Sequence, residues 1–191
     1  MTGVQTCALP IFLESIKTDS PQGLRDRALF ELIYGSGLRA GEVGRLRWED
    51  MNLDARRAVV RQSKFDKDRV VPLTHETVEM LRRFRVQERL PSPLVFPGKK
   101  GQGLTPSYIN KRFKALCAKA GLYRTGVTTH QLRHACATHL ISHGANIRYV
   151  QDLLGHESIQ TTVRYTRQMV DEVQKARSEE HTSELQSRQV I

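Results

Sequence analysis

The chain is poor in the features that mark secreted and membrane proteins. It has three cysteines among 191 residues, too few for a disulfide framework, so a reducing cytoplasm fits best. It has no apolar run of about 18 residues, the length that a membrane-spanning helix needs. Its first residues lack the basic region that opens a secretion signal. These absences leave a globular protein, long enough for one domain with a real core.

Acidic residues are also in short supply. The chain has 20 Asp and Glu against 30 Lys and Arg, which gives a formal net charge of +10 and a pI of about 9.9. Such an excess of positive charge attracts polyanions at low salt. Nucleic acid is therefore the leading partner, although a protein that is merely basic would show the same charge.

The two ends of the chain differ from the rest. RSEEHTSELQS near the C-terminus and TGVQTCALPI near the N-terminus resemble translations of one sequencing-adapter string and of its complement. We therefore expect residues 1–11 and 177–191 to be adapter-derived and not native. The native segment is then 12–176, truncated at both ends, and it holds the basic excess. Two ordinary flexible tails are the alternative, which the source DNA would decide.

Apolar periodicity predicts a mainly α-helical fold with one small antiparallel sheet, of the α+β class. Helices are expected at 24–34, 40–46, 74–88, 105–120, 131–143, 147–154 and 159–166. The stretch DARRAVVRQSKFDKDRVVPL predicts a hairpin with strands at 57–62 and 69–73. The glycines of GSG at 35–37 are expected to end the first helix, because glycine suits the left-handed cap conformation.

Four places in the sequence hold residues suited to phosphate chemistry. Arg39 follows two glycines at a helix start, where its guanidinium can offer a bidentate fork to phosphate oxygens. In HQLRH, a spacing of three places a histidine and Arg133 on one helical face. His156 follows a glycine that ends a helix, and Tyr165 comes nine positions later. Taken singly, each has an ordinary structural explanation, such as a turn cap or a core tyrosine.

The histidines also allow a metal site. His130 and His134 are four residues apart, as are His139 and His143. Side chains at that spacing share a helical face and can bind one zinc ion. No cysteine or carboxylate stands nearby as an obvious third ligand, so we expect no metal.

In their order and spacing, these stretches resemble the motifs of the tyrosine recombinases, also called the phage integrase family. GSGLRAGEV is similar to the family's first arginine motif, and HQLRHACATHL to its His-x-x-Arg motif. LLGHESIQTTVRYT is similar to its terminal block, and SKFDKDRVVPL to its hairpin with a catalytic lysine, which would be Lys64. Phe65 departs from the family, in which many members have glycine. The resemblance covers nearly all of 12–176.

The resemblance implies the catalytic-domain fold of this family, Xer-like, without the N-terminal core-binding domain. It implies DNA strand breakage and rejoining with no cofactor, because a covalent intermediate stores the bond energy. The implied catalytic residues are Arg39, Lys64, His130, Arg133, His156 and Tyr165. Tyr165 would be the nucleophile that forms a 3′-phosphotyrosyl link.

The other members of that set would assist the same step. The two arginines would clamp the non-bridging phosphate oxygens, and Lys64 would protonate the leaving 5′-oxygen. His130 would shuttle a proton near the nucleophile, and His156 would hydrogen-bond the phosphate or support its surroundings.

The implied partner is double-stranded DNA, bound by a tetramer of full-length protomers. The implied setting is the bacterial cytoplasm, at the nucleoid when bound, with a Xer-like, integron-borne or phage-borne member as candidates. DNA contacts are expected from Lys67, Arg69, Lys111, Arg112 and Lys114. Three alternatives stay open: a DNA-binding or regulatory domain without catalysis, a nicking-closing topoisomerase, and a metal hydrolase using the paired histidines.

Overall fold

The computed structural model describes residues 8–61, 68–87, 92–98, 101–123 and 125–155. The helices are α1 (Ala8–Ser15), α2 (Pro21–Ser36), α3 (Ala40–Val43), η1 (Trp48–Asp50), α4 (His75–Gln87), α5 (Pro106–Lys119), α6 (His130–Ser142) and α7 (Ile147–Leu154). The strands are β1 (Met51–Asn52), β2 (Arg57–Val60) and β3 (Arg69–Pro72). The fold is therefore mainly α-helical with one small antiparallel sheet, as predicted.

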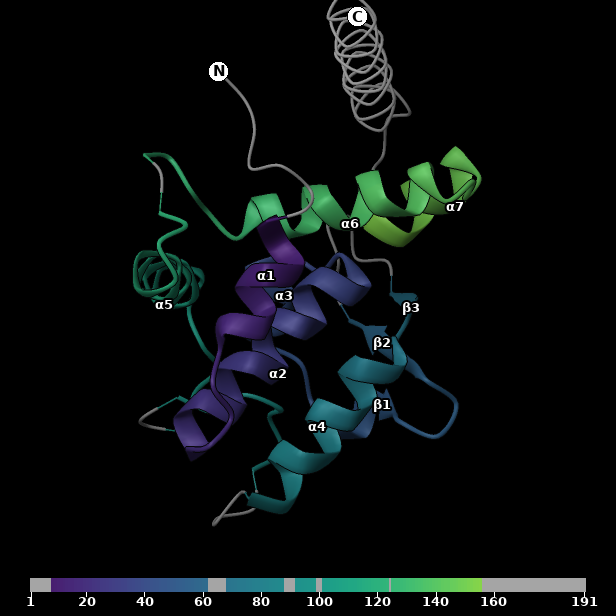
Figure 1. Ribbon diagram of the computed structural model, residues 1–191. Helices are drawn as coiled ribbons and strands as arrows, with labels where there is room; N and C mark the ends of the chain where they lie inside the picture. The colour runs from purple at the N-terminus through teal and green to yellow at the C-terminus, as the bar shows by residue number, and fades with distance from the viewer. Residues whose placement is uncertain (1–7, 62–67, 88–91, 99–100, 124, 156–191) are drawn as a thin grey trace, which may run out of the picture.

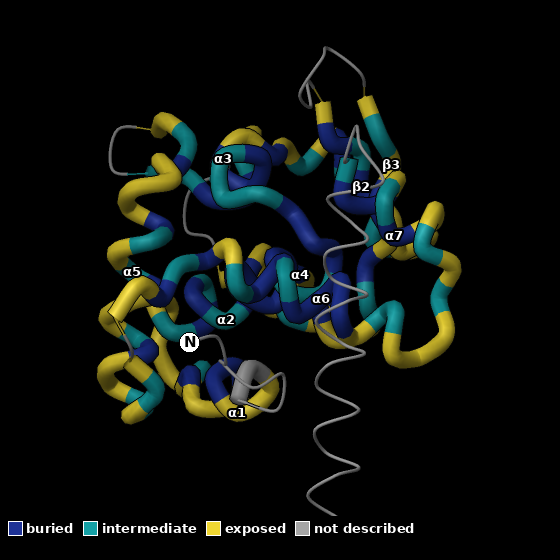
Figure 2. Tube along the Cα trace, turned by 90° about the horizontal axis from the view of Figure 1, so that it is seen from above, coloured by how far each residue is buried: buried dark blue, intermediate teal, exposed yellow. Residues whose placement is uncertain are grey.

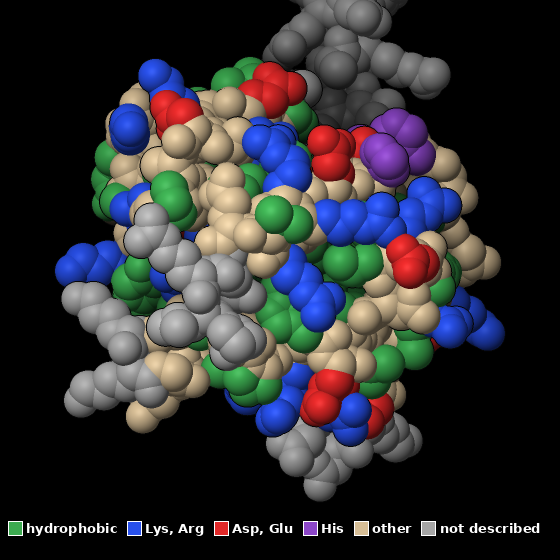
Figure 3. All heavy atoms as spheres, turned by 90° about the horizontal axis from the view of Figure 1, so that it is seen from below, with side chains coloured by type: hydrophobic (Ala, Val, Ile, Leu, Met, Phe, Trp, Pro, Cys, Tyr) green, Lys and Arg blue, Asp and Glu red, His purple; other side chains and the backbone are tan. Residues whose placement is uncertain are grey.

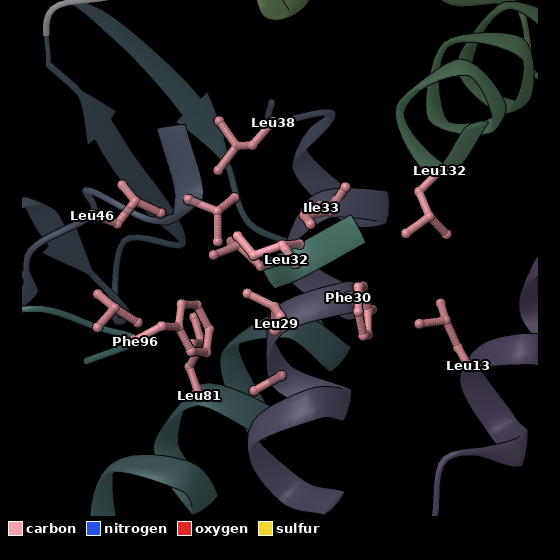
Figure 4. Packing of buried hydrophobic residues seen from close by; sticks show 14 of the residues in the cluster. Leu13, Leu29, Phe30, Leu32, Ile33, Leu38, Leu46, Leu81, Phe96 and Leu132 are labelled. Carbon is pink, nitrogen blue, oxygen red and sulfur yellow. The ribbon is translucent and has the colours of Figure 1, made fainter. Parts of the chain in front are cut away.

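Helix α2 is the centre of the domain, because it is buried on several sides. Leu24, Phe30 and Ile33 are among its fully buried residues. Figure 4 shows α2 side chains between Leu132 of α6 and Leu81 of α4. In Figure 2 the tube is exposed along much of α5, which covers one side of the body.

Three phenylalanines join α1, α2 and α5. The ring centroid of Phe12 lies 5.6 Å from that of Phe30 and 4.9 Å from that of Phe113, both edge-on. Edge-to-face contacts of this kind stabilise a core beyond the area that they bury. Helix α1 was not predicted, and it crosses the expected junction between residues 11 and 12. The origin of residues 1–11 stays a prediction.

The sheet has the order β1–β2–β3, and both pairs are antiparallel. Its register places Val59 opposite Val70 and Val60 opposite Arg69. Ala58, Val60 and Val71 are buried, so one face of the sheet packs on the core. Arg69 lies two positions before Val71 and therefore points to this inner face. The predicted hairpin is confirmed, while the two-residue strand β1 was not predicted.

Helix ends follow the capping chemistry that the sequence indicates. The Thr105 hydroxyl accepts a hydrogen bond from the Tyr108 amide at the start of α5, and Thr74 does the same for Thr77 before α4. Gly37 ends α2 with a left-handed φ of 61°. Helix α3 stops at Val43, three residues before its predicted end.

In Figure 1, α6 and α7 lie across one end of the body, and β3 lies beneath α7. Contacts between α6 and α2, and between α7 and β3, join this layer to the rest. No helix in the part of the chain that the structure describes is long and apolar enough to cross a membrane.

Candidate active site

Arg39 stands between the end of α2 and the start of α3. Its guanidinium donates from Nη1 to Glu42 Oε1 at 3.1 Å and from Nη2 to the Gly155 carbonyl at 3.2 Å. Its backbone amide donates to Glu42 Oε2 at 2.8 Å, as expected of a glutamate at the third position of a helix. The side chain is about one-third exposed. Glu42 thus fixes the backbone amide of Arg39, while part of the Arg39 side chain remains exposed to solvent.

Arg133 is the largest fully buried side chain among the described residues, with a relative exposure of 1%. It comes from α6, whose buried face packs on α2. Its Nη1 donates to the Gly37 carbonyl at 2.6 Å, and its Nη2 donates to the Leu154 carbonyl. A buried guanidinium is tolerated where such acceptors meet it. Arg133 therefore links α6 to the ends of α2 and α7.

Three arginines cap three consecutive carbonyls at the end of α7. Leu153 accepts from Arg69 Nε at 3.1 Å, Leu154 accepts from Arg133, and Gly155 accepts from Arg39. The last carbonyls of a helix have no partner within the helix, and they carry the negative end of its dipole. Cations from β3, from α6 and from the segment before α3 therefore converge on this one helix end. The sequence predicted Arg39 and Arg133 together, and the structure places them at adjacent carbonyls.

His130 begins α6, one turn before Arg133. Partial burial lowers the pKa of its imidazole, and the positive charges of Arg133 and Arg39 lower it further. The ring is thus close enough to both guanidinium groups to sense their charge. The neutral imidazole, which can accept a proton, is the favoured form at neutral pH.

Glu42 is a site residue that the sequence analysis did not single out. Its side chain is 4% exposed and accepts 2.8 Å hydrogen bonds from Arg69 Nη1 and Nη2, in addition to those from Arg39. Burial by itself would raise the pKa of Glu42, but the hydrogen bonds and charges of Arg69 and Arg39 bring it below its usual range. The signal in the sequence was the spacing of three between Arg39 and Glu42, which is that of a capping box.

Lys64, Lys67, His156 and Tyr165 lie outside the described residues. His156 follows Gly155 directly in the sequence, and Gly155 accepts from Arg39. The roles that the resemblance gave to these four residues stay predictions.

The residues expected to contact DNA fall into two groups. Arg69 points inward with its side chain 11% exposed, and Arg112 donates from Nε to the buried Asp26 at 2.8 Å. Lys111 and Lys114 are exposed on α5. On the face in Figure 3, Lys and Arg side chains are spread among acidic and neutral ones and form no single patch. Lys111 and Lys114 are thus exposed members of the predicted set, and DNA contacts of Arg69 and Arg112 stay predictions.

The paired histidines were the basis of the metal alternative. His139 and His143 stack with ring centroids 4.2 Å apart and an interplanar angle of 24°. Among the described residues, no three His, Cys, Asp or Glu side chains gather where they could hold a metal ion.

Comparison with known proteins points to the same family as the motifs. Residues 8–172 match the sequence profile of the phage integrase family. Tyrosine recombinase XerC of Xanthomonas axonopodis pv. citri is 39% identical over 155 residues, which are 81% of this chain and 50% of that protein. Tyrosine recombinase XerD of Lacticaseibacillus casei is 42% identical over 156 residues, 78% of this chain and 52% of that protein. The chain thus spans about half the length of these relatives.

Solved structures agree with these sequence matches. The crystal structure of XerA recombinase superposes with a TM-score of 0.79 at 28% identity, covering 93% of this chain and 64% of that one. XerH site-specific recombinase, in a post-cleavage complex with palindromic difH substrate, gives a TM-score of 0.77 at 30% identity over 93% of this chain and 52% of that one. With the motifs, the fold and these matches together, the chain belongs to the phage integrase family of tyrosine recombinases.

Proposed function

We propose that this chain is the catalytic domain of a site-specific recombinase that cleaves and rejoins double-stranded DNA. The observation that carries the proposal is the meeting of Arg39 and Arg133 at the adjacent carbonyls of Gly155 and Leu154. Two guanidinium groups at one place can hold the two non-bridging oxygens of a phosphodiester. Phosphoryl transfer depends mainly on such positioning and on stabilisation of charge.

In the proposed reaction, the Tyr165 phenolate oxygen attacks phosphorus and forms a P–O bond. The bond from phosphorus to the 5′-oxygen breaks, and Lys64 supplies the proton that turns this oxygen into a hydroxyl. His130, whose pKa is lowered by partial burial and by both arginines, is neutral and accepts the phenol proton. A 5′-hydroxyl of a second strand then attacks the 3′-phosphotyrosyl link and gives its proton to Lys64, while the bond from phosphorus to Tyr165 breaks and His130 returns the proton to the phenol oxygen. No bond energy is lost, so no nucleotide cofactor is required.

The assembly is also part of the proposal. Xer relatives come from bacteria, and the XerH structures are complexes with difH substrate. We place the full-length protein on DNA in the bacterial cytoplasm, as a tetramer in which each protomer contributes one Tyr165. His156 would hydrogen-bond the same phosphate.

The test is a DNA duplex with a nick close to the scissile phosphate, so that the short cleaved piece diffuses away and the adduct accumulates. The chain is expected to give a protein–DNA band that resists denaturation and forms in EDTA. Tyr165→Phe is expected to bind the same DNA but form no adduct, since it has no nucleophilic oxygen. An adduct on Tyr165→Phe would remove Tyr165 as nucleophile, and cleavage that needs a metal would favour the hydrolase alternative.

A further inference from the structure

We infer that Arg69 is a positioning residue, which neutralises Glu42 so that Arg39 keeps its charge for a phosphate. The inference rests on the proposed function, and it replaces the DNA-contacting role that the sequence suggested for Arg69. It concerns a residue that does not touch the phosphate itself. Its evidence is a set of contacts among β3, the start of α3 and the end of α7.

Every nitrogen of the Arg69 guanidinium faces an acceptor of the protein. Nη1 and Nη2 donate to the two oxygens of Glu42 at 2.8 Å each, and Nε donates to the Leu153 carbonyl at 3.1 Å. A Cβ placed on Gly155 would lie 3.4 Å from Arg69 Nη1, so the guanidinium packs directly against that glycine. The planar fork of arginine matches this bidentate geometry, which lysine cannot reproduce. Arg69 is therefore built into the protein interior and does not extend toward a ligand.

Glu42 is shared between two arginines. It accepts from Arg69 through both oxygens, and it accepts from Arg39 through the backbone amide and Nη1. A carboxylate that is almost fully buried needs a cation beside it, because its lost hydration is costly. With Arg69 present, that cation is Arg69, and the cluster of Arg39, Arg69, Arg133 and Glu42 keeps two net positive charges.

Without Arg69, Arg39 would be the remaining cation that is hydrogen-bonded to Glu42 among the described residues. Its Nη1 already donates to Glu42 Oε1 at 3.1 Å. In the absence of Arg69, we expect both terminal nitrogens of Arg39 to donate to the carboxylate, so that its charge is neutralised there. The cluster would then consist of Arg39, Arg133 and Glu42, and its net charge would be +1 in place of +2. Because the transition state carries charge on the non-bridging oxygens, the loss should appear in the rate of cleavage more than in DNA affinity.

A simple structural ion pair is the competing explanation, and the chain offers a matched example of one. Arg27 donates from Nε to Glu31 Oε2 at 2.9 Å and from Nη1 to the Leu13 carbonyl at 2.5 Å. Like Arg69, it joins one buried glutamate and one main-chain carbonyl. It ties α2 to α1, and no second arginine is hydrogen-bonded to Glu31 in the part of the chain that the structure describes. Arg27→Gln therefore measures the general cost of losing such a pair.

The experiment compares Arg69→Gln, Arg69→Lys, the double variant Arg69→Gln/Glu42→Gln, and Arg27→Gln. For each variant we would measure three quantities: the single-turnover rate of adduct formation on nicked DNA, the DNA affinity by fluorescence anisotropy, and the midpoint of thermal unfolding. Arg69→Gln is expected to cleave roughly 10²-fold more slowly, with DNA affinity within about threefold of the parent. The double variant is expected to recover about tenfold, because no carboxylate remains to bind Arg39. Arg27→Gln should lower the unfolding midpoint and leave cleavage within about threefold.

The pH profile gives a readout that a purely structural pair would not change. Among the described residues, Arg69 and Arg39 are hydrogen-bonded to Glu42, so in Arg69→Gln the hydrogen bonds that oppose its protonation come from Arg39. Burial would then favour the neutral carboxyl, and lowering the pH would release Arg39. The rate of Arg69→Gln relative to the parent should therefore rise as pH falls from 8 to 6, and this rise should be absent in the double variant.

The outcomes separate the two proposals. If the parent chain forms no adduct at saturating protein, the proposed function fails. If the parent cleaves but Arg69→Gln cleaves equally well, or the double variant is no faster than Arg69→Gln, the inference about Arg69 is overturned. Should Arg69→Gln fail to fold, Arg69→Lys decides, because it keeps the charge beside Glu42. It should cleave within about tenfold of the parent, and a folded Arg69→Lys without cleavage overturns the inference.

Discussion

Arg133 and Gly37 are joined by a 2.6 Å hydrogen bond between Nη1 and the main-chain carbonyl, across 96 positions of the sequence. Gly37 lies two residues before Arg39, so this bond fixes one arginine to the backbone that carries the other. The Arg133 guanidinium is therefore tied to the main chain beside Arg39. Because Arg133 is 1% exposed and both Nη1 and Nη2 serve main-chain carbonyls, a phosphate would bind there by replacing one of these acceptors.

Arg133→Lys tests the proposed clamp. A lysine carries one compact ammonium and cannot reproduce the planar fork that now serves Gly37 and Leu154. We expect adduct formation on nicked DNA to fall on the order of 10²–10³-fold, with DNA affinity little changed. A buried carbonyl left without its donor should also cost about 1–3 kcal/mol in the free energy of unfolding. Arg148→Lys, at an exposed position on α7, is the matched control. Parent-like cleavage by Arg133→Lys would contradict a clamping role.

Gly37→Ala tests the approach of α7 to the end of α2. Gly37 has a φ of 61°, and an added Cβ would lie 2.7 Å from Leu154 Cδ2. Gly121 has a φ of 70° with nothing within 4 Å of an added Cβ, so Gly121→Ala isolates the backbone strain, about 1–2 kcal/mol. Thermal unfolding should show a larger loss for Gly37→Ala, and adduct formation should fall in that variant alone. Equal losses of stability would show that Leu154 adjusts freely.

The pH dependence of cleavage tests His130. Partial burial, Arg133 and Arg39 all lower the pKa of this imidazole from its ordinary value of 6.5. A base with a lowered pKa stays unprotonated to a lower pH, so the acid limb of the rate should lie below pH 6.5. Replacing Arg39 with Gln removes one positive charge and should move that limb to higher pH, although the overall rate is slower. His130→Gln should abolish the limb. A limb that is unchanged in His130→Gln would assign the titration to another group.

Salt dependence tests α5 as a DNA-facing helix. Each phosphate contact contributes about −0.9 to the slope of log affinity against log salt on duplex DNA. Removing Lys111 and Lys114 together should make the slope shallower by roughly 1.8 while leaving sequence preference unchanged. Arg82→Ala/Arg83→Ala removes two exposed charges from α4 and should leave the slope unchanged. Equal effects of the two double variants would mean that binding responds to net charge alone.

The sequence predicted the parts of this fold that are governed by local rules. Helices α5 and α7 were placed within a residue or two, because Thr105 caps one and glycine ends the other. Arg39 and Arg133 were paired by motif order, and the structure brings both to the end of α7. Strand β1 has two residues, too few to show a period of two. Its existence depends on pairing with β2, which is a tertiary contact.

The buried ion pair between Arg69 and Glu42 was not predicted, for a different reason. An arginine in a basic hairpin was taken as a DNA contact, although its alternation with Val71 already assigned it to the buried face. The alternation of residues along the strand does not show which carboxylate pairs with the buried guanidinium. Glu42 provides that carboxylate, and it comes from a segment 27 positions away.

The arginine cap on α7 has a practical consequence for protein engineering. Because Leu153, Leu154 and Gly155 are each tied to a cation from a separate segment, the main chain departs from a defined point. A chimera joined just after Gly155 would take every residue beyond that point from a donor and retain all three arginines of the recipient. If the segments that follow this junction were exchanged between a XerC and a XerD protein, the properties that moved with the segment could be assigned to it.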